Sequence, residues 1–343
     1  MKLAIVGCGD VGYWIAVFAR LNVRINAVAC VDPDQARANR AARVSGAAQV
    51  FRDLSELFEG SKASRPDAVY LGVPHHLHLP LIRQCHNEGV AVLCEKPLAH
   101  TLVDAREIVE LSRIGPPVGI NYQHRYDHGC YSLLRACEFG ELGTLRYIRC
   151  NIPWHREQSY FENGGWHARL DCAGGGTLLT QGSHFLDIAL LCSGGAPVAA
   201  GGRGFQQVFV ETDVEDLFVG HVETSTGVVI EITSSMISTP EQKPTIEAYG
   251  SCGTAIYGAG GRRRILFRGA QSRVRRHPVR FVHALGRSLE GFRQWIDNGR
   301  SYDCPASGAL PVMEAVDLLY RSARNEAISR PEADEATPPP LHR

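Results

Sequence analysis

A short apolar run that leads directly into a glycine-rich turn constrains the fold of this chain more than any other feature. Residues 2–6 predict a buried strand, and an amphipathic helix is expected over residues 13–20. Between them stand Gly7, Gly9 and Gly12, with the GxGxxG spacing. The first glycine of such a turn permits a tight bend, the second leaves room for a pyrophosphate, and the third lets the helix pack against the strand. Because free N–H groups at the helix start favour phosphates, this region predicts a dinucleotide site.

An acidic residue stands where the ribose of a dinucleotide is expected. Asp32 follows the apolar run 25–31 and lies twenty residues after Gly12. A carboxylate at this place accepts hydrogen bonds from ribose hydroxyls and repels a 2′-phosphate, so NAD is favoured over NADP. Arg37 and Arg40 lie close enough in sequence to reach a 2′-phosphate, which weakens this preference.

Strand and helix patterns alternate through the first third of the chain. Strands are expected at 49–51, 67–73, 90–94 and 118–122, and helices at 34–45, 54–59, 77–88 and 101–113. This alternation predicts a parallel, doubly wound Rossmann sheet over residues 1–124. Such sheets bind ligands at the carboxyl ends of their strands. We therefore assign to cofactor binding Gly7, Gly9, Asp10, Val11, Gly12, Asp32, Pro74, His75, His78, Glu95, Lys96, Gln123 and Trp166.

The second part of the chain predicts an α+β domain with an open, largely antiparallel sheet over residues 125–330. Strands are expected at 142–153, 199–210, 217–224, 228–236, 245–250 and 254–257, and helices at 290–298 and 312–328. Residues 331–343, which are rich in proline, are expected to form a mobile tail.

Composition excludes several classes of protein. Lysine plus arginine and aspartate plus glutamate both number 36, and this zero net charge argues against a dedicated nucleic-acid binder. Neither a membrane helix nor a signal peptide is expected, because the apolar runs are too short. The 11 cysteines contain no CxxC pair, which favours reduced thiols and a cytoplasmic location. His75, His76 and His78 lack partners at ligand spacing, so no metal site is predicted.

Several motifs together identify a family resemblance. The glycine-rich start, the loop 73–78, the tripeptide Glu95-Lys96-Pro97 and the glycine-rich segment 174–187 resemble the Gfo/Idh/MocA oxidoreductases. The resemblance covers roughly residues 1–328. It implies a nicotinamide-dependent enzyme that acts on a secondary alcohol or ketone of a sugar, a cyclitol or a sugar derivative, including nucleotide-linked sugars.

The resemblance also implies roles for single residues. Lys96 would polarise the substrate oxygen, His184 would act as acid and base, and the Lys96–Pro97 peptide would be cis. The residues expected to contact substrate are Lys96, Tyr122, Arg125, Arg156, Gln158, Tyr160, Thr180 and His184.

One position departs from the family pattern. Many members carry aspartate four residues before the histidine, where this chain has Thr180. A threonine hydroxyl forms hydrogen bonds but holds no charge near pH 7, which argues against an inositol dehydrogenase while leaving the Lys96–His184 pair intact.

Partners and alternatives complete the expectations. The exposed face of the second sheet forms a subunit interface in the family, so a homodimer or homotetramer is expected. A transient oxidation without net redox change, as in a glycosidase or epimerase, and a non-enzymatic sensor both stay open. The arginine-rich stretch 262–287 is either a solvated hairpin and loop, a phosphate anchor for a nucleotide sugar, or an intersubunit patch.

Overall fold

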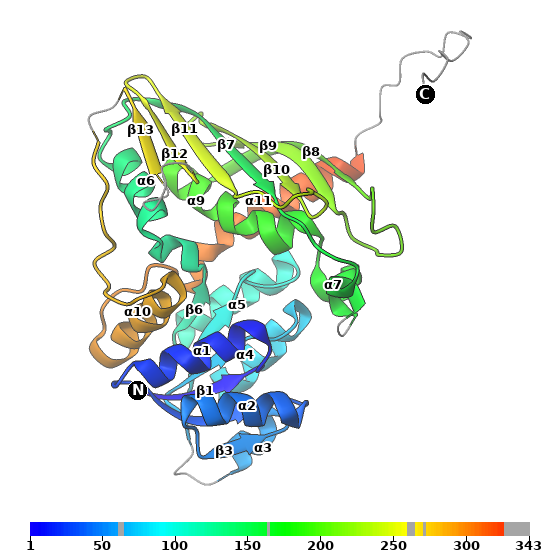
Figure 1. Ribbon diagram of the computed structural model, residues 1–343, viewed down its shortest axis with the longest axis vertical. Coiled ribbons are helices and arrows are strands. Elements are labelled where there is room, and N and C mark those ends of the chain that lie inside the picture. Colours follow the sequence, from blue (N-terminus) through cyan, green and yellow to red (C-terminus); the bar gives the residue numbers. More distant parts are fainter. Residues whose placement is uncertain (61–64, 163–164, 259–264, 270–271, 326–343) are drawn as a thin grey trace.

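Two β-sheets with their helices make up the chain (Figure 1). The computed structural model describes residues 1–60, 65–162, 165–258, 265–269 and 272–325. A six-stranded sheet has the order β3-β2-β1-β4-β5-β6, and a seven-stranded sheet has the order β13-β12-β11-β7-β10-β9-β8. The predicted fold class, a Rossmann-type sheet followed by an α+β region, is confirmed.

The first sheet is parallel throughout. Its strands are β1 (Lys2–Val6), β2 (Asn26–Val31), β3 (Gln49–Phe51), β4 (Ala68–Leu71), β5 (Ala91–Glu95) and β6 (Val118–Asn121). The helices that alternate with them are α1 (Asp10–Leu21), α2 (Gln35–Ser45), α3 (Leu54–Glu59), α4 (His78–Asn87) and α5 (Leu102–Ile114). The chain adds strands on one side of β1 up to β3 and on its other side from β4 onward, so the strand order reverses between β1 and β4. The loops after these two strands flank the crevice where such sheets bind ligands.

The second sheet is mixed, because β7 pairs with β10 in parallel while its other pairings are antiparallel. Its strands are β7 (Leu145–Pro153), β8 (Pro197–Phe205), β9 (Leu217–Thr224), β10 (Val229–Ser235), β11 (Thr245–Gly250), β12 (Thr254–Tyr257) and β13 (Ile265–Arg268). One face is covered by α6 (His128–Glu138), α9 (Ser183–Ser193) and α11 (Ala306–Asn325) (Figure 1). The remaining helical segments are η2 (His75–Leu77), η3 (Gln123–Tyr126), α7 (Ser159–Glu162), η4 (Trp166–Ala168), α8 (Leu170–Ala173), the π-helical turn η5 (Leu178–Gly182) and α10 (Ala284–Asn298).

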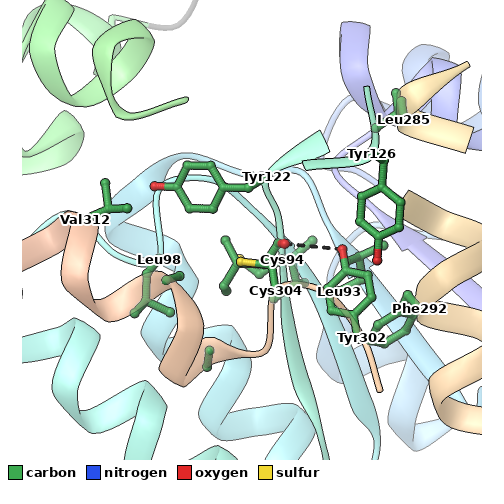
Figure 2. Packing of buried hydrophobic residues seen from close by; sticks show 14 of the residues in the cluster. Leu93, Cys94, Leu98, Tyr122, Tyr126, Leu285, Phe292, Tyr302, Cys304 and Val312 are labelled. Atoms are coloured by element: carbon green, nitrogen blue, oxygen red, sulfur yellow. Dashed lines mark hydrogen bonds between the residues drawn. The ribbon is translucent and has the colours of Figure 1, made fainter. Parts of the chain in front are cut away.

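The C-terminal part of the chain returns to the first sheet. The N–H of Ile120 in β6 donates to the carbonyl of Cys304 at 2.9 Å. Tyr302 and Phe292 pack close to β5 and β6 (Figure 2), and α10 contacts α1. The region after residue 284 therefore contacts both sheets, and the division at residue 124 stays a prediction.

Several predicted boundaries were wrong for identifiable reasons. Strand β8 ends at Phe205 and not at 210. The reason is that the Asp216 carboxylate accepts hydrogen bonds from the backbone N–H groups of the three residues 207–209. Helix α10 begins at Ala284, not at 290. Helix α11 begins at Ala306, not at 312, and carries Pro311 inside its first turns. Helix α6 was not predicted at all.

The remaining expectations concern the termini, the thiols and the arginine-rich stretch. All eleven cysteines are free thiols, as expected, and no helix in the described part of the chain is long and apolar enough to cross a membrane. Residues 331–343 and Arg262 to Arg264 lie outside the described residues. Arg275 pairs with Glu141, and Arg287 is buried and donates to backbone carbonyls, so these two arginines serve internal contacts.

Candidate active site

The glycine-rich turn has the geometry that its spacing predicts. Gly7 has φ +83°, and a Cβ there would lie 2.1 Å from the carbonyl oxygen of Gly72. A Cβ on Gly12 would lie 1.9 Å from the carbonyl oxygen of Gly7. Gly9 is different, because no atom lies within 4 Å of its Cβ position and it precedes α1 without a side-chain cap. The first and third glycines are thus required by packing, while the second faces open space at a helix N-terminus.

Asp32 ties the end of β2 to the glycine-rich turn. Its carboxylate accepts hydrogen bonds from the N–H of Cys8 at 2.7 Å and from the N–H of Asp34 at 2.8 Å. The two arginines considered for a 2′-phosphate have partners of their own. Arg37 lies 3.3 Å from the carboxylate of Asp34, and Arg40 stacks over an aromatic ring of α1.

Two buried histidines hold the loop after β4. His75 Nδ1 lies 2.7 Å from the carbonyl oxygen of Ala173. The two ring nitrogens of His78 lie 3.0 Å from the carbonyl of Pro97 and 3.2 Å from that of Val73. Burial lowers the pKa of both, that of His78 to about 4, so both are neutral at pH 7. A neutral imidazole has a single N–H, so one of these two contacts of His78 is a hydrogen bond and the other is not. The cofactor contacts expected of His75 and His78 stay predictions.

Glu95 is turned into the protein interior. Its Oε1 accepts hydrogen bonds from the Tyr70 hydroxyl at 2.9 Å and from Asn121 Nδ2 at 2.5 Å, and Ser288 in turn donates to the side-chain oxygen of Asn121. Burial raises the pKa of Glu95, while these donors and the adjacent lysine oppose that rise. The cofactor contact predicted for this side chain stays a prediction.

Lys96 reaches from the end of β5 to the π-helical turn η5. Its Nζ donates to the carbonyl oxygen of Thr180 at 2.5 Å, and the Lys96–Pro97 peptide is cis, as expected. Burial lowers the pKa of Lys96 to about 8, with Glu95 opposing the shift and Arg156 adding to it. The ammonium is therefore close to its titration range at neutral pH.

His184 begins α9 beside this lysine. Its ring packs edge-on against Tyr122 and His124, with centroid separations of 5.9 and 4.9 Å. Burial, the charge of Lys96 and the neighbouring His124 hold the pKa of His184 well below its ordinary value. A neutral imidazole can accept a proton, which is the state that a general base needs.

Unpartnered polar atoms gather in this region. Buried polar groups are normally hydrogen-bonded, and exceptions call for an explanation. Among the described residues, buried side-chain atoms without a hydrogen-bond partner include His76 Nδ1, Tyr122 Oη, Gln123 Oε1, His167 Nδ1, Ser183 Oγ and His184 Nδ1. Gln123 follows β6 at the edge where ligands are expected, so a ligand that supplies a donor would satisfy its Oε1.

Thr180 contacts Lys96 through its backbone carbonyl, while its side-chain hydroxyl forms hydrogen bonds within the turn. Its hydroxyl lies 2.6 Å from both the Gly176 carbonyl and Gln181 Oε1, and its own carbonyl accepts from Lys96. The turn is capped from a distance by Glu215, whose carboxylate accepts the N–H groups of Gly176 and Leu178. Sequence reasoning missed Glu215, since no local motif marks a cap that lies almost forty residues away.

Rings and one guanidinium form a continuous row beside Lys96. The Arg156 guanidinium lies 5.3 Å from the Tyr160 ring, which lies 4.2 Å from His167. His167 contacts Trp166 at 3.7 Å, and Trp166 contacts His75 at 4.7 Å. The structure thus brings the predicted residues Arg156, Tyr160 and Trp166 together, whereas Gln158 is exposed.

His167 is the site residue that sequence reasoning missed. Burial, Lys96 and Arg156 lower its pKa to about 4. The adjacent tryptophan and glycine run were the available signal, but a single histidine in a loop carries no motif.

Arg125, which was predicted to contact substrate, has several partners within the protein, and the substrate contact stays a prediction. It is buried and forms a two-point ion pair with Asp187, with N–O distances of 2.8 and 2.5 Å. It also donates to the carbonyls of Asp303 and Gly308. These contacts join α9 to the start of α11 and direct the guanidinium into the protein.

Family models match both parts of the chain. Residues 1–114 match the oxidoreductase family model with an NAD-binding Rossmann fold, and residues 132–256 match the GFO/IDH/MocA C-terminal domain. The chain belongs to the Gfo/Idh/MocA family. The prediction of an NAD-binding Rossmann domain is thereby confirmed, with NAD as its cofactor.

Relatives within the Gfo/Idh/MocA family are distant in sequence. Inositol 2-dehydrogenase from Corynebacterium glutamicum is 31% identical over 168 residues, which is 48% of each chain. D-glucoside 3-dehydrogenase from Escherichia coli is 27% identical over 68% of this chain and 70% of its own length. The chain spans about half the length of several curated relatives that it matches.

Solved structures share the fold of this Gfo/Idh/MocA chain over nearly its whole length. The WlbA dehydrogenase from Bordetella pertussis, in complex with NADH and UDP-GlcNAcA, superposes with a TM-score of 0.82 at 22% identity. The match covers 94% of this chain and 96% of WlbA.

Proposed function

We propose that this protein is an NAD-dependent oxidoreductase that transfers a hydride between nicotinamide and a secondary alcohol or ketone of a sugar, cyclitol or sugar derivative, including nucleotide-linked sugars. The observation that carries the proposal is the hydrogen bond from Lys96 Nζ, at the carboxyl end of the Rossmann sheet, to the carbonyl of Thr180 in the turn that leads directly into His184. Relatives named as inositol and glucoside dehydrogenases support this substrate range.

The residues of the Rossmann edge fit a dinucleotide. The open Cβ position of Gly9 and the uncapped start of α1 suit a pyrophosphate, and Gln123 Oε1 lacks a partner within the described part of the chain. The bound nicotinamide supplies the carbon that accepts or donates the hydride.

Protein groups would manage the proton in this reaction. During oxidation, Lys96 Nζ donates a hydrogen bond to the substrate oxygen and stabilises the negative charge that develops there. The His184 imidazole takes the hydroxyl proton as the carbon loses its hydride. Reduction runs the same steps in reverse, with the protonated imidazole as acid.

A substrate screen tests the proposal. Purified protein is mixed with NAD and, in turn, free sugars, cyclitols, sugar acids and nucleotide sugars, and NADH absorbance is followed. We expect stoichiometric NADH with at least one class and a weaker response with NADP. Conversion of a substrate without NADH accumulation would replace this proposal with transient oxidation of the glycosidase or epimerase type.

We also propose that the outer face of the second sheet joins subunits into a homodimer or homotetramer. In Figure 1 none of the described helices covers this face. It carries the stacked rings of Tyr147 and Tyr249 and the exposed side chains of Val219 and Val229. Light scattering at micromolar protein should give at least twice the 37.6 kDa chain mass, and a monomer would contradict the proposal.

A further inference from the structure

Lys96 has one carboxylate, Glu95, and a second cation, Arg156, in its surroundings. The carboxylate of Glu95 is occupied by Tyr70 and Asn121 on the inner side. None of the ion pairs recorded among the described residues includes Lys96, whose Nζ donates to a backbone carbonyl instead. Thr180 is uncharged at the position where a carboxylate often stands in the family. A neutral substrate would therefore leave the ammonium without an opposing charge on the ligand side.

Arg156 adds a second cation that is held in a fixed orientation. Its guanidinium lies 5.3 Å from the ring centroids of both Trp154 and Tyr160. Nη1 donates to the carbonyl of His155 at 2.9 Å and lies 3.8 Å from the exposed Glu241 carboxylate. An arginine has five N–H donors in a planar fork, so donors remain for a two-point contact with a carboxylate. Stacking between rings keeps that fork in place before a ligand arrives.

A contiguous set of side chains links this arginine to the lysine. The Tyr160 hydroxyl lies near Thr180, Gln181 and Arg156, all of which act on its pKa. Thr180 in turn accepts the hydrogen bond of Lys96. A sugar that places a hydroxyl at Lys96 would therefore reach Arg156 with a second substituent along this set of side chains.

We infer that the substrate is a sugar acid, whose carboxylate is bound by Arg156 while Lys96 and His184 act on a hydroxyl of the same molecule. This inference rests on the proposed function for the reacting hydroxyl, but the carboxylate contact is a statement about binding alone. The single positive charge of one guanidinium balances the single negative charge of a carboxylate. A phosphate, which carries up to two charges, normally gathers more donors than this surface offers.

Paired ligands test the inference without turnover. The protein is saturated with NADH, which cannot oxidise an alcohol, and Kd is measured by calorimetry. The pairs are D-glucuronate with D-glucose, D-galacturonate with D-galactose, and UDP-glucuronate with UDP-glucose, and glucose 6-phosphate serves as the phosphate probe. In at least one pair the acid should bind about 10- to 100-fold more tightly, the range of a charged hydrogen-bonded contact. Because no reaction occurs, this result is independent of whether the proposed hydride transfer is correct.

Two variants assign the effect to one side chain. Arg156→Gln should bring the acid-to-neutral ratio close to one, because the acid loses more affinity than its neutral partner does. Arg203→Gln is the matched control, since Arg203 stacks on Phe205 in β8, and it should keep the ratio. Circular dichroism and Tm would establish that both variants are folded. The inference is overturned if no acid binds more tightly than its neutral partner, if glucose 6-phosphate binds more tightly than glucuronate, or if Arg156→Gln keeps the ratio.

Discussion

The ammonium group of Lys96 donates a hydrogen bond to the backbone carbonyl of Thr180 at 2.5 Å, across 84 positions of sequence. This contact joins the end of β5 to the turn η5 that leads into α9, so it links the position of Lys96 to that of His184, the proposed acid/base residue. An ammonium has three N–H donors, and two remain for a substrate oxygen. The relationship explains how two parts of the chain build one site.

Replacing His184 by glutamine should lower kcat by about 10²- to 10⁴-fold, the usual contribution of a positioned acid or base. The glutamine side chain keeps polarity but cannot accept the proton. His221→Gln, on the exposed outer side of β9, is the control and should leave kcat unchanged. Steady-state kinetics with calorimetric NADH binding would check both. A His184→Gln enzyme that retains most of its kcat would show that another group moves the proton.

The pH profile should report Lys96. With a pKa of about 8, the Lys96 amine carries its proton and its positive charge below that pH and loses both above it. We therefore expect kcat/KM for oxidation to fall as pH rises through about 8. Because Arg156 lowers this pKa, Arg156→Gln should move the fall to higher pH, measured with a neutral substrate. A fall that moves to lower pH, or does not move, would contradict the account.

The glycine-rich turn permits a comparison between two alanine substitutions. Gly12→Ala places a Cβ 1.9 Å from a backbone oxygen and should destabilise the fold by about 1–3 kcal/mol, as overpacking does. Gly9→Ala has no atom within 4 Å, so we expect little loss of stability but an NADH Kd raised about 10-fold or more. Urea unfolding and NADH titration would separate the two. Equal stability losses would show that the open position at Gly9 is not reserved for a ligand.

The Arg125–Asp187 pair should act on stability. Asp187→Asn leaves a buried guanidinium without its counter-charge, which typically costs about 3–5 kcal/mol of unfolding free energy. Asp171→Asn breaks the exposed pair with Arg169, which solvent screens, and should change the unfolding free energy far less. Urea unfolding of both variants makes the comparison. If Asp187→Asn were as stable as Asp171→Asn, the structural role given to Arg125 would be wrong.

Short sequence motifs predicted several structural features of the candidate site. Gly12 was interpretable because its steric requirement, set by the carbonyl oxygen of Gly7, lies within a few residues of chain. The contact that requires Gly7 is with Gly72, far along the chain, and only the GxGxxG motif indicated it. The cis Lys96–Pro97 peptide was expected from the family resemblance.

Residues with distant partners were predicted less well. For Arg125, which was predicted to contact substrate, nothing in the sequence indicated its pairing with Asp187, 62 positions away. Strand β8 was predicted too long because Asp216, the residue before β9, accepts hydrogen bonds from backbone N–H groups that a longer strand would have used. Helix α10 was predicted to begin late because Gly286 weakens the helical pattern, although a Cβ there would lie 2.3 Å from the Phe281 ring. Periodicity cannot reveal contacts of this kind.

The most direct test of the central claim is NADH formation in a single turnover by Lys96→Met, compared with the wild type and with Lys243→Met, a substitution of an exposed lysine. Methionine keeps much of the side-chain length and removes the charge. With the sugar that the wild type oxidises best, we predict a rate lowered by about 10²- to 10³-fold in Lys96→Met and unchanged in Lys243→Met, as expected for loss of one oxyanion-stabilising donor. A Lys96→Met enzyme that forms NADH at a rate close to that of the wild type would contradict the account.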